Sequence, residues 1–324
     1  MVSEGKEQPN IGSIVRSILL ASLILVLPGI QWSLFGWLHI FLPLLAFYLL
    51  WVYGGYTGSR LLLSAVGIAA LVYLLLGSFD LFVFTSALLL AGYILYRSAE
   101  KGDKPYISGL KGSLALGGGW ALVIAVLSIG SDISAYGQLV GTLDEGIVEA
   151  LEYYRQSETI SAETLVILEA TLFRMQVIIP IIMPAILGSL VMLLVWFTMV
   201  AGNMVLSRVG QALPWGRYRY WHLPEKLIWL AIGTGILALT PLQPIRNIGI
   251  NCLILLSIIY CFQGLSIAVF FMNRWNIPIL LRSFFYVMIV FQSFGTILLL
   301  ILGIADIWFD FRKLKSDTAD LHKE

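Results

Sequence analysis

The side chains most able to do chemistry within the long apolar segments are amides. They are Asn203, Asn247, Asn251 and Gln263, and Asn247 and Asn251 lie one helical turn apart. Such an amide often just bonds a neighbouring helix, which is worth about 0.6 kcal/mol in a membrane. Together with the glycine run Gly117, Gly118 and Gly119, however, they could line a cavity. We expect this set to bind a small polar or aromatic solute.

A second group of charged residues follows the last apolar segment. Asp306, Asp310 and Lys313 recur at i, i+4 and i+7, so the spacing predicts that they share one helical face. They could simply mark a helix leaving the lipid, with its charges at the interface. Ionisable groups at membrane depth are costly and usually functional, so a charge gate or a partner contact is the other interpretation. Asp306, Asp310 and Arg312 are therefore candidate docking residues.

A small-residue face occurs on the first apolar segment. Ser13, Ser17 and Ala21 repeat every four residues. Small residues allow the backbone of another membrane helix to approach closely. Either the face packs within the chain or it is a docking face for a partner subunit.

Catalytic motifs are missing from the sequence. It contains no HExxH, no GxxxxGK[ST] and no GxSxG, and His39, His222 and His322 lie in separate regions. Cys252 and Cys261 are nine residues apart and so point about 180° apart on a helix. We therefore expect no enzyme activity, no cofactor and no metal site, and active transport would need a separate ATPase.

Composition points to a membrane protein. Of the 324 residues, 59% are hydrophobic and 12% are charged, whereas a soluble domain has about 25% charged residues. A net charge of +1 gives no footprint for nucleic acid. The lipid bilayer is the expected surrounding.

Hydrophobic segments predict an all-α, polytopic transmembrane helix bundle of about 8–9 spans. Residues 1–130 form an N-terminal membrane block of about five spans, 177–315 a C-terminal block of three to four, and 316–324 a polar tail. The expected spans are 12–30, 33–54, 60–77, 80–96, 109–130, 177–205, 225–241, 247–272 and 278–308.

The stretch 131–176 between the two blocks is acidic and amphipathic. Its apolar residues recur at helical spacing, which predicts one or two helices lying against something apolar. Its acidic residues are Asp132, Asp144, Glu145, Glu149, Glu152, Glu158, Glu163 and Glu169.

Charge asymmetry predicts the orientation. The loops 97–111 and 206–226 are basic and therefore cytoplasmic, which places 131–176 outside as an extracytoplasmic insertion and the N-terminus inside. Nine single spans would then put the basic C-terminal residues outside. Either the last segment breaks near Gln292 to Gly295, or one segment does not cross.

The run Leu302-Gly303-Ile304-Ala305-Asp306-Ile307-Trp308-Phe309-Asp310-Phe311-Arg312-Lys313, with Trp221-x-x-Pro224 and Gln263-Gly264-Leu265, resembles the YybS-like family of uncharacterised polytopic bacterial membrane proteins. That family is distantly similar to the substrate-binding S components of energy-coupling-factor transporters. The resemblance implies a multi-pass protein of the bacterial inner membrane. It also implies a coupling subunit or ATPase supplied in trans, which would dock on the Ser13, Ser17 and Ala21 face.

Two functions are compatible with these features. The first is a solute-binding or transport-associated membrane subunit that lacks its own ATPase. The second is a non-transport scaffold or accessory protein that contacts partners through the amphipathic stretch and the cytoplasmic loops.

Overall fold

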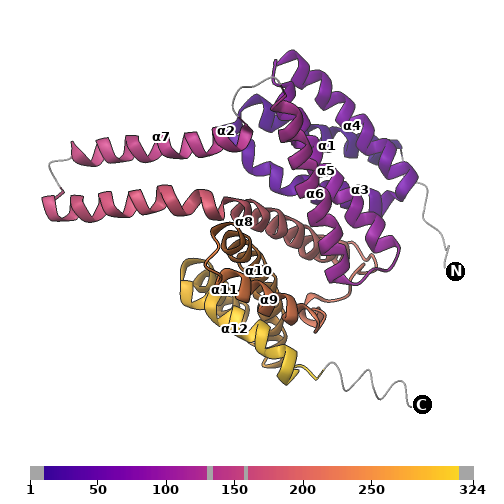
Figure 1. Cartoon of the computed structure of the whole chain (residues 1–324). Coiled ribbons are helices and arrows are strands. Elements are labelled where there is room, and N and C mark those ends of the chain that lie inside the picture. Colours follow the sequence, from indigo (N-terminus) through magenta and orange to yellow (C-terminus); the bar gives the residue numbers. More distant parts are fainter. Residues whose placement is uncertain (1–10, 130–133, 157–159, 314–324) are drawn as a thin grey trace. The chain divides into compact units, whose positions relative to one another are not determined.

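The computed structural model describes residues 11–129, 134–156 and 160–313, and all regular elements in these ranges are helices (Figure 1). This confirms the predicted all-α class. The expected polar leader Met1–Asn10 and polar tail 316–324 lie outside the described residues, as do Asp132 and Glu158 of the acidic stretch.

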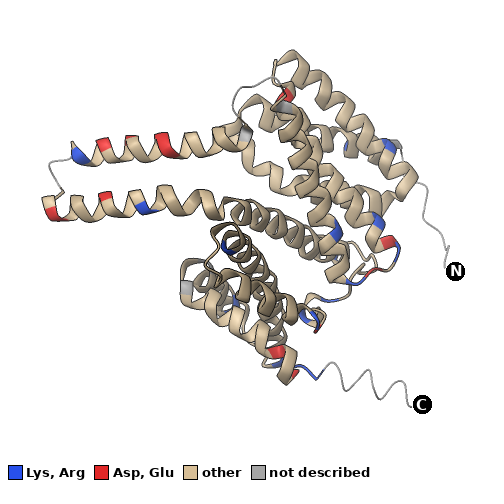
Figure 2. Cartoon of the chain, in the orientation of Figure 1, with Lys and Arg blue, Asp and Glu red and all other residues tan. Residues whose placement is uncertain are grey.

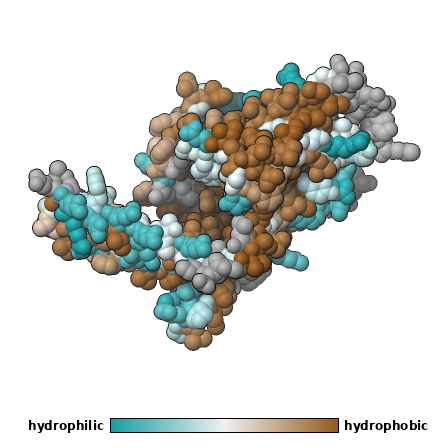
Figure 3. Space-filling model, turned by 90° about the horizontal axis from the view of Figure 1, so that it is seen from above, coloured by the Kyte–Doolittle hydropathy of each residue, from teal (hydrophilic) through white to brown (hydrophobic). Residues whose placement is uncertain are grey.

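Seven helices are long and apolar enough to cross a membrane, or eight if the bent pair α11–α12 is one span. Apolar side chains accordingly cover much of the surface seen in Figure 3. The elements are α1 Ile11–Ile30, α2 Trp32–Phe35, η1 Gly36–Phe41, α3 Leu42–Tyr53, α4 Gly55–Leu75, α5 Phe79–Glu100, α6 Pro105–Leu127, α7 Ala135–Arg155, α8 Ala162–Arg208, η2 Tyr218–Tyr220, α9 Leu227–Ala238, α10 Gln243–Arg274, α11 Ile279–Phe291 and α12 Ser293–Phe309.

Two expected spans differ from the structure. The segment 225–241 contains only the 12-residue α9, about 18 Å long at 1.5 Å per residue, whereas the hydrocarbon core is about 30 Å thick. Prolines flank this helix on both sides and keep it short. The segment 278–308 is broken at Gln292, where α11 and α12 bend by 98°, which is one of the two alternatives that the sequence left open.

The described helices form two compact units, and the first comprises residues up to Val123 together with Val191–His222. Its centre is α3, which packs against both α4 and α5. Gly58 on α4 and Gly92 on α5 each lie directly against the α3 backbone, where a side chain would collide with main-chain atoms. Leu42, Phe47 and Leu50 of α3 are completely buried as a result.

The second unit comprises Ile124–Leu190 and the chain from Leu223 onward. Its centre is α10, which packs against α9 and α12. The helix α8 continues without a break through residues 176 and 177 and contributes to both units. The division into membrane blocks 1–130 and 177–315 describes how the chain crosses the bilayer, and it stays a prediction.

The described part of the acidic stretch forms α7 and the beginning of α8, an antiparallel hairpin along which acidic residues and a few basic ones are spread (Figure 2). The helical periodicity is thereby confirmed, and Ile147 and Leu151 of the expected apolar face of α7 are buried. The Ser134 hydroxyl caps α7 by accepting from Gly137 N–H. Near the tip, Arg155 on α7 pairs with Glu169 on α8 at 2.7 Å. The predicted outward placement of this hairpin remains a prediction.

Candidate functional site

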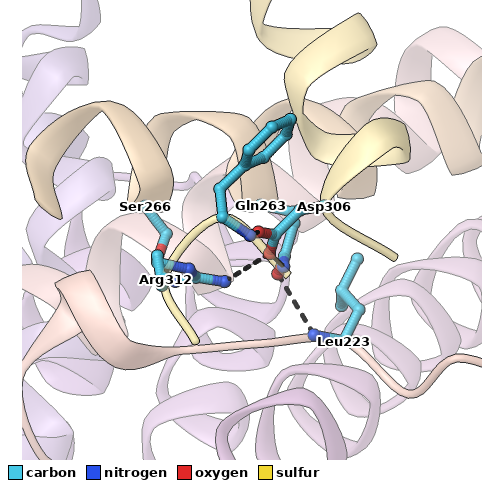
Figure 4. Close-up of polar contacts among 6 residues, drawn as sticks. Leu223, Gln263, Ser266, Asp306 and Arg312 are labelled. Carbon is cyan, nitrogen blue, oxygen red and sulfur yellow. Dashed lines mark hydrogen bonds and ion pairs between the residues drawn. The ribbon is translucent and has the colours of Figure 1, made fainter. Parts of the chain in front are cut away.

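A buried ion pair at the end of α12 is hydrogen-bonded to two side chains of α10 in the second unit (Figure 4). Arg312 Nη2 lies 2.8 Å from Asp306 Oδ2, and the two side chains are 0% and 5% exposed. Gln263 Nε2 donates to the same carboxylate oxygen at 2.7 Å, and Arg312 Nη1 donates to Ser266 Oγ at 2.8 Å. A buried ion pair is favourable only when further hydrogen bonds satisfy its groups. We call these four residues the polar network.

A reversal of the chain after α12 creates this arrangement. The helix ends at Phe309 because Asp310 adopts a left-handed conformation with φ of 38°. Phe311 N–H then donates to Asp306 Oδ1 at 3.0 Å, and Arg312 turns back toward Asp306. The prediction that Asp306, Asp310 and Lys313 share a helical face was therefore wrong, since the helix stops before Asp310. Asp306 and Arg312 are buried, and the predicted docking role of these residues stays a prediction.

The network also holds the segment that leads into α9. Gln263 Oε1 accepts from Leu223 N–H at 3.1 Å, while its Nε2 donates to Asp306. One amide on α10 thus connects α12 with the chain entering α9.

Two glycines allow α10 and α12 to cross in backbone contact. A Cβ on Gly264 would collide with the main chain of Leu299, and a Cβ on Gly303 with the main chain of Tyr260. Small residues serve this purpose between membrane helices, where close van der Waals packing drives association. The position of the polar network depends on this crossing.

Beside the network, an apolar groove of about 940 Å³ lies between α10, α11 and α12. Gln292, at the break between α11 and α12, is the single amide among the residues that line it. The other lining residues are apolar or aromatic: Ile267, Ala268, Phe271, Met272, Trp275, Ile277, Leu281, Phe284, Phe285, Met288, Ile289, Phe294, Gly295, Leu298, Leu302 and Phe311.

The network supports one wall of this groove. Phe311 lines the groove with its side chain while its N–H bonds Asp306. Ile267, the residue after Ser266 on α10, lines the groove as well. Loss of the Asp306–Arg312 pair would therefore free Phe311 and alter the groove.

Asn251, predicted to line a cavity, instead joins α10 to α8. Its Oδ1 accepts from Ala185 N–H at 2.8 Å and its Nδ2 donates to Ile181 C=O at 2.8 Å. Those two backbone groups are i and i+4, so they would bond each other in a regular helix. Nδ2 also donates to the carbonyl of Asn247. The amide thus acts in helix packing, which is the alternative that the sequence left open.

The prolines of α8 explain a second polar contact. Pro184 has no N–H, so the carbonyl of Pro180 has no partner within the helix. The Tyr136 hydroxyl on α7 donates to that carbonyl at 2.6 Å. The carbonyl left free by Pro184 thus finds its donor on the neighbouring helix, and this contact fixes the base of the hairpin.

The remaining cavity candidates lie in the first unit. Asn203 on α8 donates through Nδ2 to Gly216 C=O at 2.6 Å. The run Gly117–Gly119 lies within α6, which continues through it without a break. A Cβ on Gly119 would lie 3.5 Å from Ala87, so this glycine permits ordinary helix contact. The predicted set is thus divided between the two units, and its role in lining a cavity stays a prediction.

The predicted small-residue face packs within the chain over most of its length. Ala21 is completely buried, and Ser17 Oγ lies 2.9 Å from Tyr53 OH on α3. Ser13 is exposed. The intramolecular alternative accounts for Ser17 and Ala21.

Several polar contacts were not expected from the sequence. Trp215 is buried and donates through Nε1 to Ser108 Oγ at 2.8 Å. His39 is 8% exposed and lies 2.9 Å from Thr85 Oγ1. The role of Ser266 had no signal in the sequence, because serine is common in membrane helices.

Metal ligation finds no support in the described parts of the chain. No group of three or more His, Cys, Asp or Glu residues that could hold a metal ion occurs within 11–129, 134–156 and 160–313.

The long apolar helices and buried polar network define a polytopic α-helical membrane protein. The family model described as "Predicted membrane protein (DUF2232)" matches residues 19–307, and the chain belongs to that family. No curated protein and no solved structure matches the chain.

Proposed function

We propose that this protein is a transport-associated membrane subunit that binds an apolar or amphiphilic molecule in the groove between α10, α11 and α12. It acts without enzymatic chemistry of its own and without its own ATPase. The observation that carries the proposal is the groove itself, which lies where a membrane-length apolar segment breaks and bends by 98°.

Broken helices are typical of membrane binding sites. Irregular backbone at membrane depth is tolerated where it is covered by protein or lines a cavity. In transporters, discontinuous helices form the substrate site. The α11–α12 pair, with Gln292 at its break, has this character.

The lining selects the class of ligand. Aromatic rings such as Phe271, Phe284 and Phe294 offer large apolar contact areas. Met272 and Met288 add flexible side chains that adapt to a chain of variable shape. A charged group buried here would lack partners and cost several kcal/mol. We therefore assign an acyl chain or a comparable apolar tail to the groove, with its head near Gln292.

The sequence supports the remaining parts of the proposal. The chain has no Walker motif, so a transport cycle would require a coupling subunit or ATPase in trans. The resemblance of the C-terminal run to the YybS-like family, and of that family to S components, supports a binding subunit in the bacterial inner membrane.

Photolabelling in native membranes tests this function. A diazirine-bearing fatty acid should label residues 267–311 saturably, and unlabelled fatty acid should compete. Leu298→Trp fills the groove, whereas Ile301→Trp, also on α12 and also about half exposed (49% and 57%), lies outside it. We expect labelling to fall about tenfold in the first variant only, the loss of roughly 1.4 kcal/mol of affinity. Non-saturable labelling spread over all helices would mean ordinary lipid contact and would overturn the proposal.

A further inference from the structure

The first half of α8 carries an exposed apolar face that its hairpin partner does not cover. Val166, Phe173 and Val177 are 66%, 56% and 65% exposed, and Ala170 between them is exposed as well. We call these four residues the α8 stripe. Their spacing of four, three and four residues is that of the a and d positions of a coiled coil.

Two charged residues flank this stripe at the positions that select coiled-coil partners. With Ala170 and Val177 at a, and Val166 and Phe173 at d, Glu169 occupies a g position and Arg174 the following e position. In a parallel pair of helices, a g residue meets the e residue five places later on the other helix. Glu169 and Arg174 are five places apart and opposite in charge.

Both residues are able to make this contact. Arg174 is exposed and makes no ion pair with any residue that the structure describes. Glu169 Oε1 already accepts a hydrogen bond from Arg155. A carboxylate has about four lone-pair positions, so its Oε2 can receive a second guanidinium.

We propose that the α8 stripe pairs with the α8 stripe of a second copy of this chain in a parallel coiled coil. Two copies inserted in one bilayer have the same orientation, so a two-fold axis relating them runs along the membrane normal. Helices that cross near that normal are then parallel, as the Glu169–Arg174 pairing requires. The inference does not depend on the proposed ligand groove.

The length of α8 places the stripe beyond the hydrocarbon. The helix has 47 residues and is about 70 Å long, more than twice the roughly 30 Å of a hydrocarbon core. Three of its four charged residues, Glu163, Glu169 and Arg174, lie in the first half, and the fourth, Arg208, is the last residue of the helix. In water, an apolar face of this kind is stabilised by being covered.

A short contact suffices because both copies are held in the membrane. The stripe spans only about 16 Å, which would be weak for free helices. Confinement in one bilayer raises the effective concentration of the second stripe. A lipid surface is the less suitable cover, since the acidic hairpin would be repelled by anionic lipid.

Cysteine cross-linking tests the pairing in the full-length protein. In a background with Cys252→Ser and Cys261→Ala, Ala170→Cys lies at an a position and faces its own copy across the axis. Thr171→Cys is the control, because Thr171 is exposed but points away from the stripe. Oxidation of native membranes should give a disulfide-linked dimer at least fivefold more abundant for Ala170→Cys. Equal yields, no dimer, or a cross-link to a different protein would overturn the proposal.

Charge exchange tests the register. Arg174→Glu places a second carboxylate opposite Glu169 of the other copy and should reduce the Ala170→Cys cross-link severalfold. Co-expression with a chain carrying Glu169→Arg should restore it, because each mixed pair then has two opposite-charge contacts; that chain also carries Arg155→Glu, so that the hairpin keeps an opposite-charge pair at the position of Arg155 and Glu169. Arg174 is exposed, so its substitution leaves the fold intact. An unchanged cross-link in Arg174→Glu, or no restoration by the mixture, would contradict parallel pairing.

Discussion

Arg312 is the side chain on which the end of α12 depends most. It is completely buried and bonds both Asp306 and Ser266. We expect Arg312→Gln to lower the free energy of unfolding by about 3–5 kcal/mol, because it leaves the Asp306 carboxylate buried without its cation. Unfolding of the purified protein in mixed micelles measures this.

The matched control is an ion pair on the surface of the same chain. Arg97 and Glu100 pair at 2.9 Å with side chains 50% and 47% exposed, so Arg97→Gln should cost under about 1 kcal/mol. Adding Asp306→Asn to Arg312→Gln should recover part of the loss, because no charge is then left buried. If Arg312→Gln and Arg97→Gln lowered the free energy of unfolding equally, burial would not determine how much the Asp306–Arg312 pair contributes to stability.

Asp103, in the turn between α5 and α6, makes stability depend on pH. Hydrogen bonds from Lys111 and Ser98 lower its pKa below the usual value. The folded pKa lies below the unfolded value of about 3.9, so these bonds stabilise the fold above that pH and cease to do so as pH falls through the folded pKa. Asp103→Asn should therefore lower the melting temperature at pH 7 and match the wild type once the pH falls below the folded pKa. A difference independent of pH would contradict this role.

Among the elements, the α10–α12 crossing imposes the strictest requirement for glycine. Gly264→Ala adds a Cβ where the main chain of Leu299 lies, so the two helices must separate. We expect a loss of about 2 kcal/mol or more, comparable to overpacking a core, measured by unfolding in mixed micelles.

Gly235→Ala on α9 is the control, since a Cβ there meets no atom within 4 Å. Alanine is favoured over glycine within a helix by roughly 0.5–1 kcal/mol, so this variant should be neutral or more stable. If Gly264→Ala and Gly235→Ala changed the free energy of unfolding by the same amount, close helix crossing would not explain the need for glycine at position 264.

Elements were predictable where hydrophobic length or periodicity specified them. Runs of about twenty apolar residues located the long helices, and spacing on 131–176 located the amphipathic helices. The break at Gln292 was one of two alternatives that charge asymmetry left open. The full extent of α8 was not predictable, because the pattern changes from amphipathic to apolar near residue 176 although the helical backbone continues through it.

At the scale of the whole molecule, the candidate site was predictable only in part. Gln263 and Asp306 were both singled out, but as members of different sites. Their contact joins residues 43 positions apart and depends on Gly264 and Gly303 meeting across two helices. Nothing local to either residue specifies such a crossing, so the groove beside it also escaped prediction.

The two units suggest a division of work within the chain. The first unit is built on α3 with a continuous buried core. In the second, α10 holds a polar network, a broken helix pair and a groove. We assign ligand binding to the second unit, while the exposed stripe of α8 brings two copies together.

Native mass spectrometry of the purified protein shows whether one amphiphile occupies the α10–α12 groove. We expect one tightly bound fatty acid or lipid per chain that survives delipidation, disappears in Leu298→Trp and persists in Ile301→Trp. A wild-type protein that releases all bound amphiphile as readily as Leu298→Trp, or bound amphiphile that is retained equally in both variants, would rule out an amphiphile site in this groove.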